Sequence, residues 1–529
     1  MATPIFLVID VGTGSVRAAA VNKNGEMLAF SAKEHDQHVP KYGWCEQRPI
    51  DWWQGACESI NAVVRQIGQR KSDIVAVSCC GQMHGTVLID ESGQPTREYV
   101  PLWNDKRTIN HVNQYQDNFG LESCLTHTAN PPTPAWPGFK LQWFADNEPE
   151  LLEKSWKVLM PKDFINFRLT GKFAFDTTEA SASFLMDADT KEWSQTMLSQ
   201  LGVPRRLLPP LRDALDVLGS ISFKAAQETG LPEGLPVVVG GGDFPVTLVG
   251  SGVTEPGMGS DVTGTSSIIT IANREPVRHE EVCNVLIPGN HWGAFSLLDA
   301  GGDAVRWARR AMNENTLSYE AATTKAAESP AGSRHLFFLP YLTGERLGAT
   351  RNSRAQFFGL NSSHSLADLH RSVLEGVAFA VRRQIEQMSG SDIKSTSDTN
   401  SAFDTNSAFD TKTDTGAKVE RIIAASGGAK SLLWLQIKAS MYNTPILVPK
   451  EAECGVIGAT AIAATATGHF NSLSDATRHL VQYEKEIQPN PEWKDTYDRM
   501  YPMFNKIKAA TSDLYSELDK LEETILPNT

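Results

Sequence analysis

An aspartate followed by a run of small residues interrupts an apolar strand pattern twice in this chain. The first copy reads Asp10-Val-Gly-Thr-Gly-Ser-Val16, and the second reads Asp261-Val-Thr-Gly-Thr-Ser-Ser267, about half the chain later. Each copy predicts a tight β-hairpin, because its small residues permit a sharp turn and leave backbone N–H groups free to bind an anion. The repeat therefore predicts a duplicated fold that binds a polyphosphate between two lobes, which indicates an ATP-using enzyme.

The length of 529 residues exceeds what one hydrophobic core usually supports, so we expect two domains. We place their boundary in the turn-rich segment 254–257, which predicts an N-terminal lobe over residues 1–256 and a C-terminal lobe over 257–529. Residues 389–416 are rich in Ser, Thr, Asp and Asn and contain the tandem copy TNSAFDTNSAFD. Because such a composition buries too little apolar surface to fold, we interpret this segment as a low-complexity surface insertion.

The composition excludes several classes of partner. A formal net charge of −13 argues against non-specific binding to nucleic acid, which needs a basic surface. The N-terminus has no basic segment before its apolar run, and no uncharged stretch is long enough to span a bilayer. Seven scattered cysteines form no CxxC pair, which is typical of free thiols in a reducing compartment. We expect a cytoplasmic protein with neither a nucleic-acid nor a membrane partner.

Apolar periodicity and turn residues predict the main elements of each half. Helices are expected over residues 50–69 and after the capping box that begins at Ser365, with Leu369, Val373, Val377 and Val381 facing a core. The expected strands cover residues 73–81, 236–244, 295–299, 336–346 and 419–425.

Two aspartates at strand ends are candidates for catalysis and for Mg²⁺ binding. Asp243 follows the triplet Gly240-Gly241-Gly242, where backbone can approach a ligand closely. It is either a general base that takes the proton from a substrate hydroxyl or a cap of the next helix. Asp10 either orients Mg²⁺ or water near the phosphates or caps the hairpin turn, and the repeat of its motif favours the functional role.

Polar residues after other strands suit the recognition of a polyhydroxy compound. Gln82, Met83 and His84 follow a strand, although His84 taken alone is more typical of a structural histidine. Trp103 and Asp105 belong to the segment Trp-Asn-Asp-Lys-Arg, whose opposite charges either reach the same pocket from one strand face or form an exposed ion pair of little energetic weight.

A double glycine after a strand, Gly427-Gly428, would let an adenine or ribose lie against bare backbone. No P-loop, no protein-kinase HRD or DFG motif and no GxSxG nucleophile motif is present in the sequence.

Taken in order, these segments resemble the FGGY carbohydrate kinases, and among them most closely the xylulokinases. The similarity runs over nearly the whole chain. The segments that carry it are DVGTGSVR (10–17), GWCEQRPIDWW (43–53), GQMHG (81–85), LWNDKR (102–107), MPKDFINFRLTG (160–171), GGGD (240–243), GTSS (264–267), FLPYLTGER (338–346), FFGL to LEG (357–376) and SGGAKSLLWLQ (426–436).

The resemblance implies an α/β, two-lobed fold of the actin, hexokinase and Hsp70 type (ribonuclease H-like), with duplicated domains and a central cleft. It implies that Asp243 is the catalytic base, that Asp10 assists near the phosphates and the metal, and that Met83 and His84 contact the sugar. Gln82, Trp103 and Asp105 complete the expected substrate site. The residues expected to bind ATP are Gly12, Thr13, Gly14, Ser15, Arg17, Gly264, Thr265, Gly427, Gly428 and Ala429.

We therefore expect ATP- and Mg²⁺-dependent phosphorylation of a ketopentose, D-xylulose at its 5-hydroxyl. Phe244-Pro245 stands where xylulokinases usually carry small or amide residues, which leaves open another pentulose, a polyol or a related sugar such as autoinducer-2. A non-catalytic, actin-like nucleotide-binding protein is the alternative from another class, and the presence of both Asp10 and Asp243 counts against it. Dimers are common in xylulokinases, so a homodimer is part of the expectation.

Overall fold

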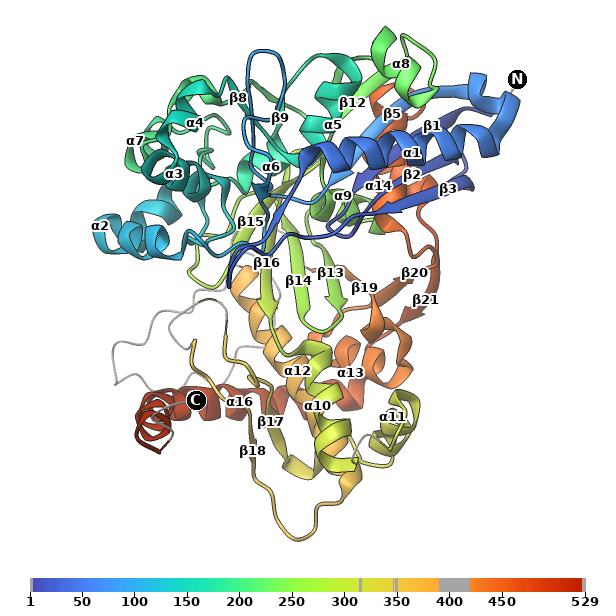
Figure 1. Cartoon of the computed structure of the whole chain (residues 1–529). Helices are drawn as coiled ribbons and strands as arrows, with labels where there is room; N and C mark the ends of the chain where they lie inside the picture. Colours follow the sequence, from blue (N-terminus) through green and yellow to red (C-terminus); the bar gives the residue numbers. More distant parts are fainter. Residues whose placement is uncertain (1–2, 314–315, 346, 348–350, 390–418, 526–529) are drawn as a thin grey trace. The chain divides into compact units, whose positions relative to one another are not determined.

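The computed structural model describes residues 3–313, 316–345, 347, 351–389 and 419–525 (Figure 1). They form two compact units. The first contains Met1–Glu255, Cys283–Gly293 and Glu451–Gln482, and the second contains Pro256–Val282, Ala294–Lys450 and Tyr483–Thr529. Residues 390–416 of the expected insertion lie outside the described residues. The assignment of sugar and nucleotide binding to lobes 1–256 and 257–529 stays a prediction.

The first unit is built around a mixed sheet in the strand order β11-β12-β5-β1-β2-β3. β1 (Ile5–Val11), β5 (Ile74–Gly81) and β12 (Pro236–Gly242) are parallel, whereas β2 (Ser15–Asn22) and β3 (Met27–Glu34) continue antiparallel from β1. β1 and β5 are buried along almost their whole length, which explains their nearly continuous apolar sequences. α1 (Pro49–Ile67) packs on β2 and β3, and in Figure 1 it crosses in front of this sheet.

Shorter elements complete the first unit. Its remaining strands are β4 (Glu46–Gln47), β6 (Val87–Ile89), β7 (Val100–Pro101), β8 (Lys157–Leu159), β9 (Phe175–Asp176), β10 (Leu211–Arg212), β11 (Val217–Ser220) and β15 (Cys283–Ile287). Its remaining helices are α2 (Ile109–Thr128), α3 (Pro137–Asn147), α4 (Pro149–Lys154), α5 (Pro161–Thr170), α6 (Thr177–Ser181), α7 (Gln195–Leu201), α8 (Phe223–Thr229), α9 (Asp243–Ser251), α14 (Cys454–Ala466) and α15 (Leu473–Leu480).

Two glycines allow α9 and α14 to cross in close contact within the first unit. A Cβ added to Gly250 on α9 would lie 1.7 Å from the carbonyl oxygen of Cys454, and one added to Gly458 on α14 would lie 2.0 Å from that of Val246. α14 also packs against β1, β5 and β12. The crossing therefore connects the sequence-distant segment 451–482 to the helix that begins at Asp243.

The second unit repeats the strand order of the first. Its strands follow the order β16-β14-β13-β19-β20-β21, in which β13 (Met258–Thr263) is antiparallel to β14 (Ser267–Asn273) and parallel to β19 (Arg421–Ala425). β20 (Ile446–Pro449) is parallel to β19, as β12 is parallel to β5. The hairpins β1–β2 and β13–β14 thus occupy corresponding positions, which confirms the two hairpins predicted from the sequence repeat.

The other elements of the second unit are the strands β16 (His291–Leu298), β17 (Phe337–Leu339), β18 (Gln356–Phe358) and β21 (Tyr483–Ile487), and the helices α10 (Gly301–Asn313), α11 (Tyr319–Ala327), α12 (Leu366–Met388), α13 (Leu432–Tyr442) and α16 (Pro491–Ile525).

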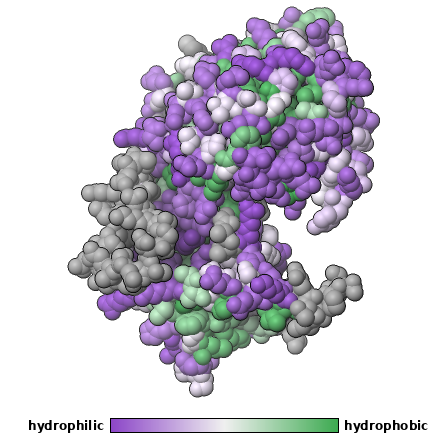
Figure 2. Space-filling view, turned by 90° about the vertical axis from the view of Figure 1, so that its left-hand side faces the viewer, coloured by the Kyte–Doolittle hydropathy of each residue, from purple (hydrophilic) through white to green (hydrophobic). Residues whose placement is uncertain are grey.

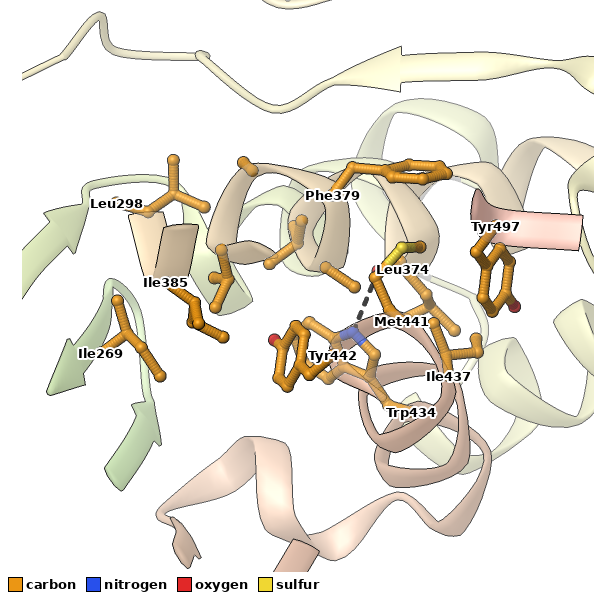
Figure 3. Close-up of a cluster of buried hydrophobic side chains, with 14 of the residues drawn as sticks. Ile269, Leu298, Leu374, Phe379, Ile385, Trp434, Ile437, Met441, Tyr442 and Tyr497 are labelled. Atoms are coloured by element: carbon orange, nitrogen blue, oxygen red, sulfur yellow. Dashed lines mark hydrogen bonds between the residues drawn. The ribbon is translucent and has the colours of Figure 1, made fainter. Parts of the chain in front are cut away.

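α12 forms the centre of the second unit's hydrophobic core. Figure 3 shows its residues Leu374, Phe379 and Ile385 packed among side chains of α13 and the neighbouring strands. The indole Nε1 of Trp434 on α13 donates a hydrogen bond of 3.1 Å to the carbonyl oxygen of Leu374, which connects the two helices (Figure 3). Ser365 and Asp368 form the predicted capping box at the start of α12.

Several sequence-based boundaries need correction. The strand expected over 236–244 is shorter, because β12 ends at Gly242 and Asp243 opens a helix. The register of β12 with β5 also shifts between Val238 and Gly241. The strand expected over 336–346 covers only Phe337–Leu339. All seven cysteines are free thiols, as predicted.

One face of the molecule is largely polar (Figure 2). Figure 2 shows that hydrophilic side chains predominate on this face and hydrophobic ones form smaller groups. Among the described residues, no helix combines the length and apolar character needed to cross a membrane.

The glycine contact between α9 and α14 can be tested with two alanine substitutions in one helix. Gly458→Ala should lower the free energy of unfolding by roughly 1–3 kcal/mol or more, because the added methyl group meets backbone that cannot move aside. Gly455→Ala is the matched control, since its Cβ would lie 3.5 Å from Thr247 Oγ1, an ordinary contact. Thermal unfolding followed by circular dichroism measures both, and equal melting temperatures would show that the crossing tolerates a side chain.

Candidate active site

The carboxyl ends of three parallel strands gather candidate residues at one edge of the first unit's sheet. Asp10 on β1 pairs with Cys80 on β5, and Cys80 pairs in turn with Gly241 on β12. Neighbouring strands lie about 4.8 Å apart, so the residues that follow these positions are close in space. Asp10, the segment Gln82–His84 and Asp243 therefore come together although about 230 residues separate the first from the last.

Asp10 is partly exposed, with 14% of its side-chain surface accessible, and is only partly neutralised. Its Oδ2 lies 3.7 Å from Nη1 of Arg17, and the same Nη1 donates to Glu453 Oε2 at 3.4 Å. Its Oδ1 has no nitrogen or oxygen partner among the described residues. Burial raises the pKa of the Asp10 carboxyl, and Arg17 opposes that rise. This carboxylate is consequently available to a ligand or a cation.

Asp243 is the first residue of α9. The backbone N–H of Phe244 donates to its Oδ1 at 2.7 Å. Burial, together with the smaller effect of the neighbouring negative charge of Asp10, raises the pKa of Asp243 to about 7. A carboxyl group with a pKa near neutrality can accept and release a proton under physiological conditions, as a general base must.

The glycine triplet before Asp243 serves packing within the unit. Gly240 has a φ of +69°, and a Cβ there would lie 1.9 Å from the carbonyl oxygen of Cys79. Cβ atoms at Gly241 and Gly242 would meet Thr178 and Met83 at less than 3.0 Å. The sequence-based interpretation, that the glycines let a ligand approach, is corrected here: strands, Thr178 and Met83 already occupy that space.

His84 is held by its main chain in a conformation that side-chain-bearing residues seldom adopt, with a φ of +65°. Its N–H donates to Glu179 Oε2 at 3.3 Å, and its carbonyl oxygen accepts from Nζ of Lys140 at 2.7 Å. The imidazole packs edge-on against Trp136 with ring centroids 5.1 Å apart. Burial lowers the pKa of His84 well below its usual value, so the ring is neutral and its unpartnered Nδ1 can serve a ligand.

Lys140 and Glu179 were not singled out from the sequence, yet both contact the His84 segment. Burial lowers the pKa of Lys140 to about 7 and raises that of Glu179 well above its usual value. Each is fully buried, and Glu179 Oε1 has no partner among the described residues. The signal available in the sequence for Lys140 was a lysine between two apolar residues, in Phe-Lys-Leu.

Trp103 and Asp105 lie in a turn after β7, so the expectation of one strand face is wrong. The pair formed by Asp105 and Arg107 is buried, not exposed, because Arg107 donates to both carboxylate oxygens at 2.8 Å. Cys45 N–H also donates to Asp105 Oδ2 at 2.7 Å, so this side chain is engaged within the unit. Trp103 is half-exposed, and its Nε1 donates to Thr13 Oγ1 at 3.1 Å.

The second unit brings the remaining candidates together. The hairpin residues Gly264 and Thr265 follow β13, and Gly427 and Gly428 follow the parallel neighbour β19. The hydroxyl of Ser426 lies 3.4 Å from a Cβ placed on Gly264, so the two turns are adjacent. Ala429 closes the second turn and is buried.

A further glycine pair, Gly301-Gly302, had escaped the sequence analysis. The N–H groups of Gly302 and Asp303 donate to the carbonyl oxygens of Gly264 and Thr265, at 3.0 and 2.9 Å. A Cβ on Gly302 would lie 2.1 Å from Gly264 O. These bonds hold the start of α10 against the hairpin, and the sequence signal was a second double glycine between a strand and a helix.

The two repeated aspartates have different surroundings. Asp261 is buried, and Lys438, Thr263 and Tyr442 all donate to its carboxylate, with Nζ of Lys438 at 2.9–3.0 Å. Asp10 has weaker partners, namely the longer contact with Arg17 and a hydrogen bond with the Cys80 thiol. Asp261 is therefore neutralised inside its unit, whereas Asp10 remains available.

No cluster of three or more His, Cys, Asp or Glu side chains within the described ranges could hold a metal ion. Asp10 and Asp243 can supply one or two carboxylates, which matches the way Mg²⁺ is usually bound together with phosphate oxygens and water.

Family comparison agrees with this duplicated arrangement. The model of the N-terminal domain of the FGGY family of carbohydrate kinases matches residues 5–250, and that of the C-terminal domain matches residues 260–467. The chain belongs to the FGGY family of carbohydrate kinases. It is accordingly a sugar kinase with the duplicated fold of that family.

This FGGY kinase is 29% identical to the xylulose kinase of Bacillus subtilis (strain 168) over 516 residues, which cover 96% of this chain and 98% of that protein. The structure of a ligand-bound xylulose kinase from Lactobacillus acidophilus superposes with a TM-score of 0.85 at 25% identity, covering 97% of this chain and 100% of that one. A gluconate kinase from L. acidophilus gives a TM-score of 0.86 at 24% identity, covering 98% and 100%, and shares the fold. An autoinducer-2 kinase of Klebsiella pneumoniae is 26% identical, covering 95% and 93%.

The contrast between Asp10 and Asp261 predicts opposite effects of the same substitution on stability. Asp261→Asn should lower the free energy of unfolding by roughly 3–5 kcal/mol, because it leaves the buried Lys438 ammonium without its counter-charge. Asp10→Asn should leave stability unchanged or higher, because it removes a charge that burial already disfavours. Thermal unfolding of the two variants measures the difference, and similar losses in both would contradict it.

Proposed function

We propose that this carbohydrate kinase transfers the γ-phosphoryl group of ATP to a ketopentose, D-xylulose, at its 5-hydroxyl. The observation that carries the proposal is the carboxyl group of Asp243, which has a pKa of about 7. It lies at the same edge of the sheet as Asp10 and the segment Gln82–His84. The similarity to xylulose kinases over nearly the whole chain supports the choice of sugar.

Unpartnered polar atoms support a hydroxyl-rich substrate beside Asp243. Gln82 Oε1, His84 Nδ1 and Glu179 Oε1 are buried and have no hydrogen-bond partner among the described residues. Each such atom costs on the order of 1–3 kcal/mol until a partner satisfies it. A sugar offers several hydroxyl groups at once, so its binding would remove this cost at more than one atom.

Asp243 would accept the proton of the attacking hydroxyl as the phosphoryl group is transferred. The Phe244 N–H bond to Oδ1 orients the carboxylate, and Met83 packed against Gly242 supports the same turn. The negative charge of Asp10 makes Asp243 more basic, which favours acceptance of the proton.

The hairpin loops and the turn after β19 fit a nucleotide. Cβ positions on Gly14 and Gly427 are open, with nothing within 4 Å of the first and only Thr263 O at 3.9 Å from the second, so a ligand can approach bare backbone there. We assign Gly12–Ser15, Arg17, Gly264 and Thr265 to the phosphates, and Gly427–Ala429 to the adenosine. Bound Mg²⁺ would supply charge neutralisation at the phosphates, and Asp10 Oδ1 is the atom best placed to contact it.

Phe244 gives a specific reason to test other sugars. It directly follows the proposed base and lies in the first turn of α9, so its ring can change the shape of the substrate site. Another pentulose, a polyol, or a sugar related to gluconate or autoinducer-2 is the second candidate.

A coupled ADP-release assay with Mg-ATP tests the proposal against D-xylulose, D-ribulose, L-xylulose, xylitol, glycerol and gluconate. We expect strong turnover with D-xylulose, and a loss of roughly 10²- to 10⁴-fold in kcat for Asp243→Asn. Preference for another compound would move the specificity assignment and keep the chemistry. An Asp243→Asn variant with near-normal turnover would falsify the role of the base.

The raised pKa of Asp243 predicts the pH dependence of the reaction. At saturating Mg-ATP, kcat/KM for the sugar should fall tenfold per pH unit below about 7, because the protonated carboxyl cannot accept a proton. Asp10→Asn removes a charge that raises this pKa, so the midpoint should move to lower pH. Asp117→Asn, at an exposed position on α2, is the control. A flat pH profile of the wild type would contradict the role of Asp243 as the base. The same midpoint pH in the wild type, Asp10→Asn and Asp117→Asn would contradict it too.

A further inference from the structure

The segment 43–53 (GWCEQRPIDWW) has no role in the function proposed so far, yet it places one buried side chain between two loops of the site. Gln47, on β4, is 2% exposed. Its Nε2 donates to the carbonyl oxygen of Thr13 in the first hairpin loop at 2.7 Å. Its Oε1 accepts from Nε2 of Gln82, at the start of the proposed sugar-binding segment, at 2.8 Å.

The orientation of the Gln47 amide follows from its other partners. The indole Nε1 of Trp52 donates to Oε1 at 3.0 Å, and an indole N–H can only donate. The carbonyl oxygens of Thr13 and Asp36 can only accept, and both lie on the Nε2 side, at 2.7 and 3.4 Å. With the amide reversed, Gln47 Nε2 would face the Trp52 N–H, a donor against a donor. Gln47 Oε1 would then face the carbonyl oxygens of Thr13 and Asp36, an acceptor against acceptors.

This orientation decides that of Gln82. Because Gln47 presents an acceptor, Gln82 must donate its Nε2, and its own Oε1 is then directed elsewhere. That Oε1 is buried and has no partner among the described residues. Gln82 Oε1 can therefore offer a sugar hydroxyl an acceptor.

We propose that Gln47 is a positioning residue for both substrates: its amide orders the Thr13 loop for the phosphates and directs Gln82 Oε1 toward a sugar hydroxyl. The inference rests on the proposed function, because it takes the two loops to be the phosphate and sugar sites. Gln47 touches neither substrate; it determines how the groups that do are presented.

Two substitutions separate the contacts of Gln47. Gln47→Met has a similar volume but loses the hydrogen bonds to both Thr13 and Gln82. KM for ATP and KM for the sugar should therefore each rise at least about fivefold. In Gln47→Glu, the ionised carboxylate keeps acceptors for Trp52 and Gln82 but has no donor for the carbonyl oxygen of Thr13. Its KM for ATP should rise at pH 8, while its KM for the sugar stays within about twofold of wild type.

Protonation of the introduced carboxyl restores a donor to the Thr13 side. As the pH falls, the KM for ATP of Gln47→Glu should therefore return toward the wild-type value measured at each pH. A purely structural role would change melting temperature without this pH-dependent recovery. Gln69→Glu, at an exposed position after α1, introduces the same charge as a control.

The outcomes distinguish the inference from the function on which it rests. A wild-type protein that phosphorylates none of the sugars tested overturns the proposed function, and nucleotide affinity, measured by calorimetry with ADP, then tests the Thr13 contact alone. Unchanged KM values in Gln47→Met, or equal effects of Gln47→Glu on both substrates at every pH, overturn the positioning role.

Discussion

The parallel alignment of β1, β5 and β12 is the constraint on which the first unit's site depends. Parallel strands end at the same edge of a sheet, so residues that follow each strand meet there whatever their separation in the chain. Asp10, Gln82–His84 and Asp243 are collected in this way. The bulge at Gly240 and the glycine contact between α9 and α14 then determine where the third strand gives way to the helix that carries Asp243.

Within each of the two units, buried polar groups fall into two classes. Some are completed within the protein, such as the carboxylates of Asp105 with Arg107 and of Asp261 with Lys438. Others keep an atom without a partner, among them Asp10, Gln82, His84 and Glu179. Because burying an unpartnered polar atom costs stability, the second class marks where a ligand is expected. His84 lies in the left-handed region, where its main chain is held by Lys140 and Glu179, which is a local strain beside these unpartnered atoms.

The duplication shows how one local structure acquires two roles. Both copies of the Asp-containing hairpin fold in the same way and begin sheets with the same strand order. Their aspartates differ because α13 supplies Lys438 and Tyr442 to Asp261, whereas Arg17 reaches Asp10 at the longer distance of 3.7 Å. Similarity of local sequence therefore did not establish similarity of chemistry.

The sequence by itself determined the local elements: the two hairpins, the strands β5 and β19, the capping box of α12 and the placement of candidate residues at strand ends. These depend on neighbours within a few residues, namely apolar periodicity and small turn residues. Only the tertiary structure decided which candidates meet, that the Asp105 carboxylate is buried and paired with Arg107, and that the glycine triplet serves packing. It also placed Lys140 and Glu179 against the His84 segment, Gln47 between Thr13 and Gln82, and Gly301-Gly302 against the hairpin of the second unit. Burial, pKa shifts and hydrogen-bond completion arise from residues tens to hundreds of positions apart, which no local pattern records.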